Sequence, residues 1–279
     1  MTINELGATA FLIAGIRALE GSRDAPLFSD PYASLFVDAE WQARTQALLN
    51  VHFAVGDAIR LRTIALNRMV EAEIAQGTRQ IVTLGSGFDM RHAIFKAEGV
   101  RFFEVEQPAV LDFKAEVLGK AGVPMCTAVA CDYLEDGLPG RLCQVGLDPE
   151  AQTLFVWEGN TMYLPVERLF EFLGRLSGQM KRFRVGFDYL LKSVLDGTYE
   201  DPEAVSVVRG LQKAMGVDWV TGFDSLERFE TDVPFNVIKS APVLENTFDD
   251  SGSNVSDVLP SASDLSDTFA GIYRLALIE

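Results

Sequence analysis

The chain has 279 residues, of which 48% are hydrophobic, and a formal net charge of −16 at pH 7. This length suits one large α/β domain or two small ones, and the hydrophobic content is high enough to fill a core. The acidic excess argues against a nucleic-acid partner, because binding phosphates needs clustered Lys and Arg. No stretch approaches the roughly 18–20 apolar residues of a membrane span, and the apolar run Phe11–Ile16 lacks the preceding basic residues of a signal peptide. We therefore expect a cytoplasmic protein with no membrane partner.

The N-terminal 76 residues read as helices around one loop. Residues 8–19 have helical spacing, and residues 22–33 form a loop marked by two prolines. Pro31 can open the next helix, because proline is tolerated in a first turn. Residues 54–76 then read as a long helix. We expect residues 1–76 to form a helical lid over the rest of a single domain.

A strand and a glycine turn follow this helix, in the segment Ile81-Val82-Thr83-Leu84-Gly85-Ser86-Gly87. Residues 81–84 are β-branched or aliphatic, which is typical of a buried parallel strand. Gly85 and Gly87 lack a Cβ, so the backbone can turn sharply and approach a ligand. Residues 90–97 read as the next helix. The pattern predicts the first unit of a nucleotide-binding α/β sheet.

The residues after the turn distinguish two classes of cofactor. A dinucleotide fingerprint places a third glycine where this chain has Met90, which disfavours a nicotinamide oxidoreductase. Asp89 would oppose a pyrophosphate, whereas it suits the ammonium group of S-adenosyl-L-methionine. Asp89 could instead cap the following helix, and the two roles are compatible.

The second strand, residues 100–106, ends in two acidic side chains on the same side, Glu104 and Glu106. Glu106 lies about 20 positions after Gly87, the spacing of the acidic residue that binds ribose hydroxyls. We expect Glu106 to take this role, although Glu104 is an alternative and Glu106 could be a simple strand-end charge. The following helix begins at Pro108.

The third strand, residues 125–130, ends beside Asp132, which either accepts from an adenine amino group or is an ordinary turn residue. The fourth strand, residues 153–157, places Glu158 at the edge where open α/β sheets bind ligands. The remaining expected elements are a helix at 165–180, a strand at 184–190 and closing strands at 235–243 and 271–278. Residues 77–190 would form the cofactor-binding core, residues 191–231 a helical insertion acting as a lid, and residues 232–279 the closing strands around a mobile polar segment at 245–267.

Four segments of the chain resemble the leucine carboxyl methyltransferase family, including its bacterial polyketide O-methyltransferase branch. They are residues 22–35, 79–91, 103–118 and 158–165, within a resemblance that covers roughly residues 18–190. The resemblance implies a Rossmann-like class I methyltransferase fold. This fold is a seven-stranded, mostly parallel sheet with helices on both faces and a terminal antiparallel hairpin. The implied cofactor is S-adenosyl-L-methionine, and no metal is implied or expected from the few Cys and His residues.

The resemblance also implies the positions of the cofactor contacts. Arg62 would hold the cofactor carboxylate through a bidentate fork, Glu158 would lie near the methionine moiety, and Tyr163 near the reacting end. The other implied contacts are Gly85, Gly87, Glu106, Asp132 and Tyr133. The chain departs from the family pattern at Glu106, where aspartate is commoner, and at His92, where a second arginine is commoner.

The acceptor is expected to be a small molecule. A carboxylate is ionised at neutral pH and needs no base, whereas a phenol or alcohol normally does. Neither His52 nor His92 is well placed to be that base, while Arg91 and Tyr163 could orient a carboxylate. We expect carboxyl O-methylation. The alternatives are phenol or alcohol O-methylation, and a non-catalytic protein that binds S-adenosyl-L-methionine to regulate a partner.

Overall fold

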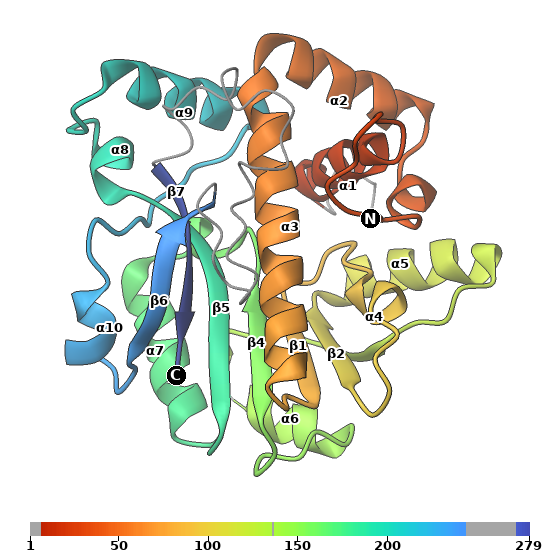
Figure 1. The fold of residues 1–279 in the computed structure, drawn as a ribbon, viewed down its shortest axis with the longest axis vertical. Coiled ribbons are helices and arrows are strands. Elements are labelled where there is room, and N and C mark those ends of the chain that lie inside the picture. Colours follow the sequence, from red (N-terminus) through yellow and green to blue (C-terminus); the bar gives the residue numbers. More distant parts are fainter. Residues whose placement is uncertain (1–6, 136, 244–271) are drawn as a thin grey trace.

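The computed structural model describes residues 7–135, 137–243 and 272–279, in which seven strands form one sheet of order β3-β2-β1-β4-β5-β7-β6 (Figure 1). The strands are β1 (Gln80–Leu84), β2 (Arg101–Glu106), β3 (Thr127–Ala130), β4 (Thr153–Trp157), β5 (Phe183–Leu190), β6 (Val237–Pro242) and β7 (Tyr273–Ile278). β1 to β5 pair in parallel, while β7 runs antiparallel to both β5 and β6. The predicted mostly parallel sheet with a closing antiparallel hairpin is confirmed.

The central strands form because their residues are apolar on both faces. Every residue of β1 and β4 is buried. In β4, Leu154 and Val156 belong to one hydrophobic cluster, and Phe155 and Trp157 belong to the other. This alternation follows from the two-residue period of a strand, and it requires helices to cover both faces of the sheet.

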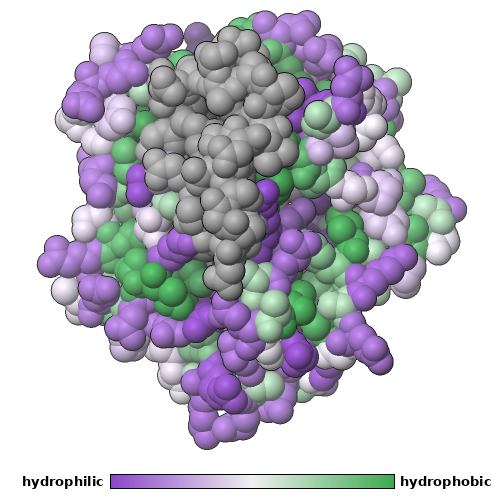
Figure 2. Space-filling model, in the orientation of Figure 1, coloured by the Kyte–Doolittle hydropathy of each residue, from purple (hydrophilic) through white to green (hydrophobic). Residues whose placement is uncertain are grey.

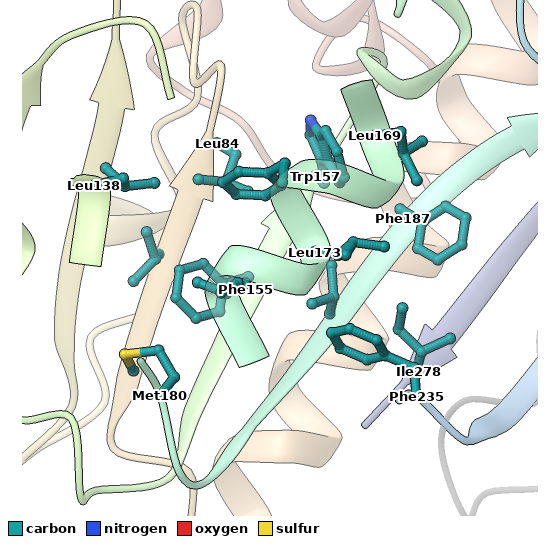
Figure 3. Close-up of a cluster of buried hydrophobic side chains, with 14 of the residues drawn as sticks. Leu84, Leu138, Phe155, Trp157, Leu169, Leu173, Met180, Phe187, Phe235 and Ile278 are labelled. Carbon is teal, nitrogen blue, oxygen red and sulfur yellow. The ribbon is translucent and has the colours of Figure 1, made fainter. Parts of the chain in front are cut away.

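Two groups of helices supply this cover. On one face lies the long helix α3 (Phe53–Ala75), whose apolar side chains join those of α8 (Lys192–Asp196) and α9 (Pro202–Met215). On the other face α7 (Val166–Ser177) packs Leu169 and Leu173 against the sheet, as Figure 3 shows, with α6 (Leu138–Gln144) and α10 (Glu227–Thr231) beside it. The predicted covering of both faces is confirmed.

The N-terminal helices pack around the end of the sheet near the glycine turn. They are α1 (Ala8–Glu20), the 3-10 turn η2 (Ala33–Phe36) and α2 (Ala39–Val51). The prediction that Pro31 opens the second helix is wrong: α2 begins after Asp38, whose carboxylate accepts a hydrogen bond from the Trp41 amide. An aspartate supplies the acceptor that a helix N-terminus lacks, and Pro31 does not.

Three connecting elements complete the carboxyl end of the strands. α4 (Arg91–Ile94) is one turn long, shorter than the predicted helix at 90–97. α5 (Pro108–Ala121) begins at its proline as predicted. The short turn η3 (Thr161–Tyr163) follows β4. In the insertion, α8 and α9 each end at a glycine with positive φ, Gly197 and Gly216.

Hydrophilic residues border the face of the molecule seen in Figure 2, with smaller hydrophobic areas between them. Among the described helices, none is long and apolar enough to cross a membrane. The polar segment 245–267, predicted to be mobile, lies outside the described residues.

Candidate active site

A cavity of about 750 Å³ opens at the carboxyl edge of the parallel strands. Its floor comes from the glycine turn after β1 and from the ends of β2 and β4. Its walls come from α1, α3, α5 and α9; in Figure 1, α1 and α9 lie beyond the upper end of the strands and α3 runs along the sheet. This is the edge at which the sequence predicted ligand binding, because open α/β sheets bind ligands outside the carboxyl ends of their strands.

The glycine turn lies in the cavity lining, with Gly85 at φ +58° and Gly87 at φ +48°. A Cβ at Gly85 would stand 2.7 Å from the Asn160 side-chain nitrogen, so a larger residue would clash. A Cβ at Gly87 would meet only Ala10, at 3.9 Å. Any side chain there would therefore grow into the space between the turn and α1. Both glycines keep the cavity open, as a ligand lying against the backbone requires.

The two acidic residues of β2 have different surroundings. Glu106 lines the cavity, and its oxygens accept the Gly87 amide at 2.8 Å and the Gln107 amide at 2.7 Å. Glu104 is buried behind the turn against the Lys114 ammonium and the Ser86 hydroxyl. Each Glu106 oxygen uses one acceptor position and keeps another, which suits two hydroxyl donors. Of the two candidates for the ribose, only Glu106 reaches the cavity.

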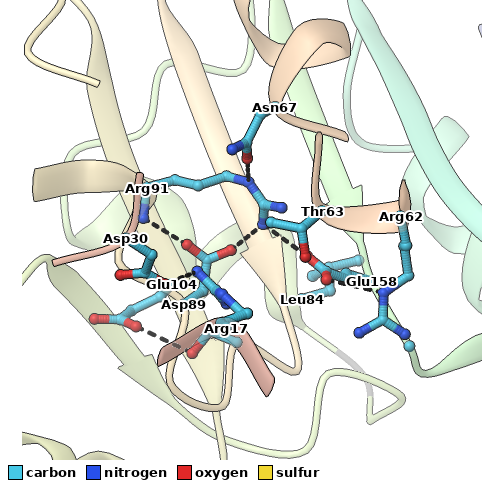
Figure 4. Close-up of polar contacts among 12 residues, drawn as sticks. Arg17, Asp30, Arg62, Thr63, Asn67, Leu84, Asp89, Arg91, Glu104 and Glu158 are labelled. Carbon is cyan, nitrogen blue, oxygen red and sulfur yellow. Dashed lines mark hydrogen bonds and ion pairs between the residues drawn. The ribbon is translucent and has the colours of Figure 1, made fainter. Parts of the chain in front are cut away.

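Glu158 lies between two buried arginines (Figure 4). Its Oε1 accepts from Arg62 Nε at 3.0 Å, and its Oε2 lies 2.8 Å from Arg91 Nη1. Burial by itself would raise the pKa of Glu158, but Arg91, Arg62 and the nearby Arg17 together lower that pKa to about 2. Glu158 is therefore anionic throughout the physiological range. It lines the cavity together with Arg62.

Arg91 is not where the sequence interpretation put it. The prediction made it a cationic group that orients the acceptor, but its side chain is 1% exposed and lies outside the cavity lining. It pairs with Asp89 and Glu158, and its Nε donates to Asn67. One of its partners, Glu158, directly follows the end of β4. Arg91 is buried because it lies at the first turn of α4, directly behind both carboxylates.

Asp89 lines the cavity and is also tied to α4. One of its oxygens accepts the Arg91 amide at 2.6 Å, and the other pairs with the Arg91 guanidinium. The N-cap position of α4 is Met90 and has no side-chain cap, so Asp89 accepts the amide of the first helical residue without being the N-cap. Its place in the cavity lining leaves room for a contact with an ammonium group.

Asp132 and Tyr133 lie outside the cavity lining. The Tyr133 ring makes edge-to-face contacts with Trp157 and Phe172, and its hydroxyl accepts the Trp157 indole N–H at 3.1 Å. The Tyr133 ring is thus part of the core under α7, and its predicted contact with adenine stays a prediction. Asp132 accepts the Leu134 amide, as its turn alternative implies. The Cys131 amide donates to the Glu106 carbonyl oxygen, which holds the neighbouring Asp132 close to Glu106 at the ends of β2 and β3.

Several lining residues were not identified from the sequence. The Tyr273 hydroxyl accepts from Arg62 Nη1 at 2.9 Å and donates to the fully buried Asp188. Burial works against the charge of Arg62, but Tyr273, Glu158 and Asp188 more than offset this and raise its pKa. Arg17 of α1 also lines the cavity, 2.6 Å from Asp30. No local pattern could reveal these partners, because they come from distant parts of the chain.

Tyr163 lines the cavity as predicted, beside Trp219 of the loop after α9. Burial raises the pKa of the Tyr163 hydroxyl, and the Trp219 indole and Arg62 only partly oppose the rise. The hydroxyl is therefore protonated at neutral pH. Neither histidine lines the cavity, and His92 Nε2 lies 3.1 Å from the Pro124 carbonyl oxygen. No group of three or more potential metal ligands occurs among the described residues.

Comparison with known proteins places the chain in a family. The model of leucine carboxyl methyltransferase matches residues 10–176. Two proteins named as proposed S-adenosyl-L-methionine-dependent methyltransferases, from Streptomyces avermitilis and Streptomyces coelicolor, are each 38% identical over 183 residues, 62% of this chain and 64% of theirs. A Frankia alni protein with the same description is 32% identical over 235 residues, 78% of this chain and 81% of its own. The match thus spans just under two thirds of the length of the Streptomyces relatives.

Two solved structures have the same fold. One is a DUF574 family protein from Streptomyces avermitilis, with a TM-score of 0.62, 16% identity, and coverage of 95% of this chain and 96% of that one. The other is a proposed methyltransferase from Thermobifida fusca, with a TM-score of 0.61, 14% identity, and coverage of 89% and 92%. At these identities the likeness concerns the fold.

Proposed function

The chain belongs to the leucine carboxyl methyltransferase family of S-adenosyl-L-methionine-dependent methyltransferases, and we propose that it methylates a carboxylate oxygen of a small molecule. The pairing of Arg62 with Glu158 in the cavity carries this proposal. A guanidinium beside a carboxylate is complementary to the carboxylate and ammonium of an amino-acid end, because each charge meets its opposite.

The other cavity residues fit the rest of this cofactor. The spare acceptor positions of Glu106 suit a ribose diol, and the open glycine turn leaves room for the chain that joins ribose to methionine. Asp89 lies where it could contact the ammonium group. Asp132 remains our candidate for the adenine amino group because it follows the strand end beside Glu106.

The residues of this chain act by position. When bound, S-adenosyl-L-methionine supplies an electrophilic methyl group on a sulfonium sulfur. Arg62, Glu158 and Glu106 hold the donor at several points, which limits its motion relative to the acceptor. We further propose that residues before 76 and residues 191–231 act as lids, because α1, α3 and α9 wall the cavity and would exclude water from it.

Support for a carboxylate acceptor comes from the protonation states around the cavity. Such an acceptor has a pKa near ~4 and has no proton to lose at neutral pH. A phenol or alcohol normally needs a positioned base, yet neither histidine lines the cavity and Glu158, with a pKa of about 2, is too weak a base. Tyr163 keeps its proton and can donate to the acceptor. Arg91 and Tyr163 were both predicted to orient the acceptor. Because Arg91 is buried outside the cavity lining, we assign this role to Tyr163 alone.

Two measurements test the proposal. Calorimetry should detect binding of S-adenosyl-L-methionine in the micromolar range, roughly −8 kcal/mol, and no comparable binding of NAD. Incubation with a panel of metabolites should yield a base-labile methyl ester, with His52→Ala and His92→Ala keeping most of kcat. An alkali-stable methyl ether would point to phenol or alcohol methylation. Binding without turnover of any acceptor would point to a non-catalytic regulator.

A further inference from the structure

The cavity has a charged part and an uncharged part. Its charged lining residues come from α1, α3, α5 and the strand ends: Arg17, Arg62, Asp89, Glu106, Asp112 and Glu158. The part between α3 and α9 is lined by Val55, Ile59, Leu211 and Met215, with Leu190 of β5 behind them. A charge would be poorly solvated there, whereas an apolar group would gain from burial.

Trp219 is held at the edge of the uncharged part. The amides of Val220 and Thr221 donate to the Met162 carbonyl at 2.8 and 3.2 Å, and the Thr221 hydroxyl donates to the Leu164 carbonyl. These bonds join the loop after α9 to the segment that carries Tyr163. The Trp219 ring and the Tyr163 hydroxyl are therefore fixed relative to each other in the cavity wall.

The Trp219 indole N–H is buried beside the Tyr163 hydroxyl, whose pKa it lowers, yet within the described part of the chain it makes no hydrogen bond of ordinary geometry. Most buried polar groups in native proteins are paired, and leaving one unpaired is unfavourable. Indole nitrogen is a donor only, so its partner must be an acceptor atom. The neighbouring Tyr163 hydroxyl is one such atom, and a ligand oxygen lying between Trp219 and Tyr163 in the cavity would be another.

We infer that Trp219 donates to the carboxylate of the methyl acceptor beside Tyr163, and that the wall of α3 and α9 holds an uncharged, apolar remainder of the same molecule. The inference rests on the proposed function. Two donors match a group that has two oxygens and no proton. An alcohol would present one oxygen and a proton for which Trp219 offers no acceptor. The preferred substrate class is thus the apolar monocarboxylates.

The test measures binding of three probes to the protein loaded with S-adenosyl-L-homocysteine: octanoate, 1-octanol and octanedioate. Wild type should bind octanoate at least about tenfold more tightly than either of the others, because 1-octanol lacks the anion and octanedioate carries a second charge to the uncharged wall. Trp219→Phe keeps an aromatic ring and removes the N–H. Octanoate binding should weaken roughly 10- to 100-fold, the range of a hydrogen bond to a charged group.

Two controls separate this inference from a folding defect and from the proposed function. Val220→Ala, at an exposed neighbouring position, should bind octanoate as wild type does. Trp219→Phe should keep its affinity for S-adenosyl-L-homocysteine within about twofold. If Trp219→Phe fails to fold, Tyr163→Phe gives the second reading, with a selective loss for octanoate.

Equal octanoate affinity in wild type and Trp219→Phe, or no preference for octanoate over 1-octanol, would overturn the inference while leaving a cofactor-binding methyltransferase in place. Absence of S-adenosyl-L-homocysteine and S-adenosyl-L-methionine binding by wild type would instead overturn the proposed function on which the inference rests.

Discussion

The strand-edge side of the cavity, which arginines of α1 and α3 also reach, and its helical side, formed by α9 and the loop after it, are built by different forces. On the strand-edge side, Glu158, Arg62 and Arg91 form a continuous set of buried ion pairs behind the glycine turn. On the helical side, α9 and the loop that carries Trp219 contribute no charged residue to the lining. One side is organised by charge and the other by apolar packing.

The two sides of the cavity should differ in how well their residues tolerate substitution. Buried charges need partners in fixed positions, so replacing one residue of the strand-edge side disturbs several others. Apolar walls tolerate changes of shape more easily. The matched family segment, residues 10–176, includes the charged side and ends before α9. If the charged side binds the methyl donor and the helical side binds the methyl acceptor, the donor would be common to the family and the acceptor would be particular to this chain.

The largest expected effect concerns Arg91. Arg91→Met leaves Asp89 and Glu158 buried without their shared cation, so the free energy of unfolding should fall by about 3–5 kcal/mol. Chemical denaturation measures this loss. The control is Arg168→Met, whose exposed pairing with Glu171 should be worth less than about 1 kcal/mol. An undiminished stability together with a collapse of kcat would return Arg91 to the catalytic role predicted from the sequence.

The next effect concerns Arg62. Arg62→Ala should weaken S-adenosyl-L-methionine binding by roughly 1.5–3 kcal/mol, the scale of a hydrogen bond between charged groups. Arg62→Lys should recover only part, because a point charge cannot reproduce the planar fork. Calorimetry provides the measurement. Arg60, which pairs with Glu20 and lies outside the cavity lining, is the matched control. Equal losses of affinity in Arg60→Ala and Arg62→Ala would show that the effect is general to α3.

A smaller effect should separate the two acids of β2. Glu106→Gln replaces one acceptor oxygen in the cavity with a donor group and should cost about 1–2 kcal/mol of cofactor affinity. Glu104→Gln alters the pair with Lys114 and should lower stability without changing the affinity of the folded protein. Calorimetry and denaturation on both variants distinguish the roles. The reverse pattern would transfer the ribose to Glu104.

The smallest effect concerns the proposed lids. Amide hydrogen exchange in α1, α3 and α9 should slow when S-adenosyl-L-homocysteine and an acceptor bind, because these helices wall the cavity. The exchange of α7, on the other face of the sheet, provides the internal reference. Unchanged exchange in α1 and α9 would mean that the walls are rigid and that the acceptor enters an open site.

The sequence by itself determined the sheet and the donor side of the cavity. Contiguous apolar residues in β1 and β4 specify buried strands. Gly85 and Gly87 specify the turn that follows β1 and lines the cavity. These features are local, because strand burial and positive φ are properties of short segments. The acidic end of β2 was also predicted from spacing, and the structure places Glu106 in the lining.

Only the tertiary structure decided which side chains meet. Arg91 and Tyr133 carry residue types that suit a site, but one pairs behind the turn and the other packs under α7. Tyr273 joins Arg62 from β7, and Trp219 joins Tyr163 through hydrogen bonds between two loops. The physical reason is that such contacts depend on how elements distant in sequence pack, and the local patterns that specify helices, strands and turns contain no information about those partners.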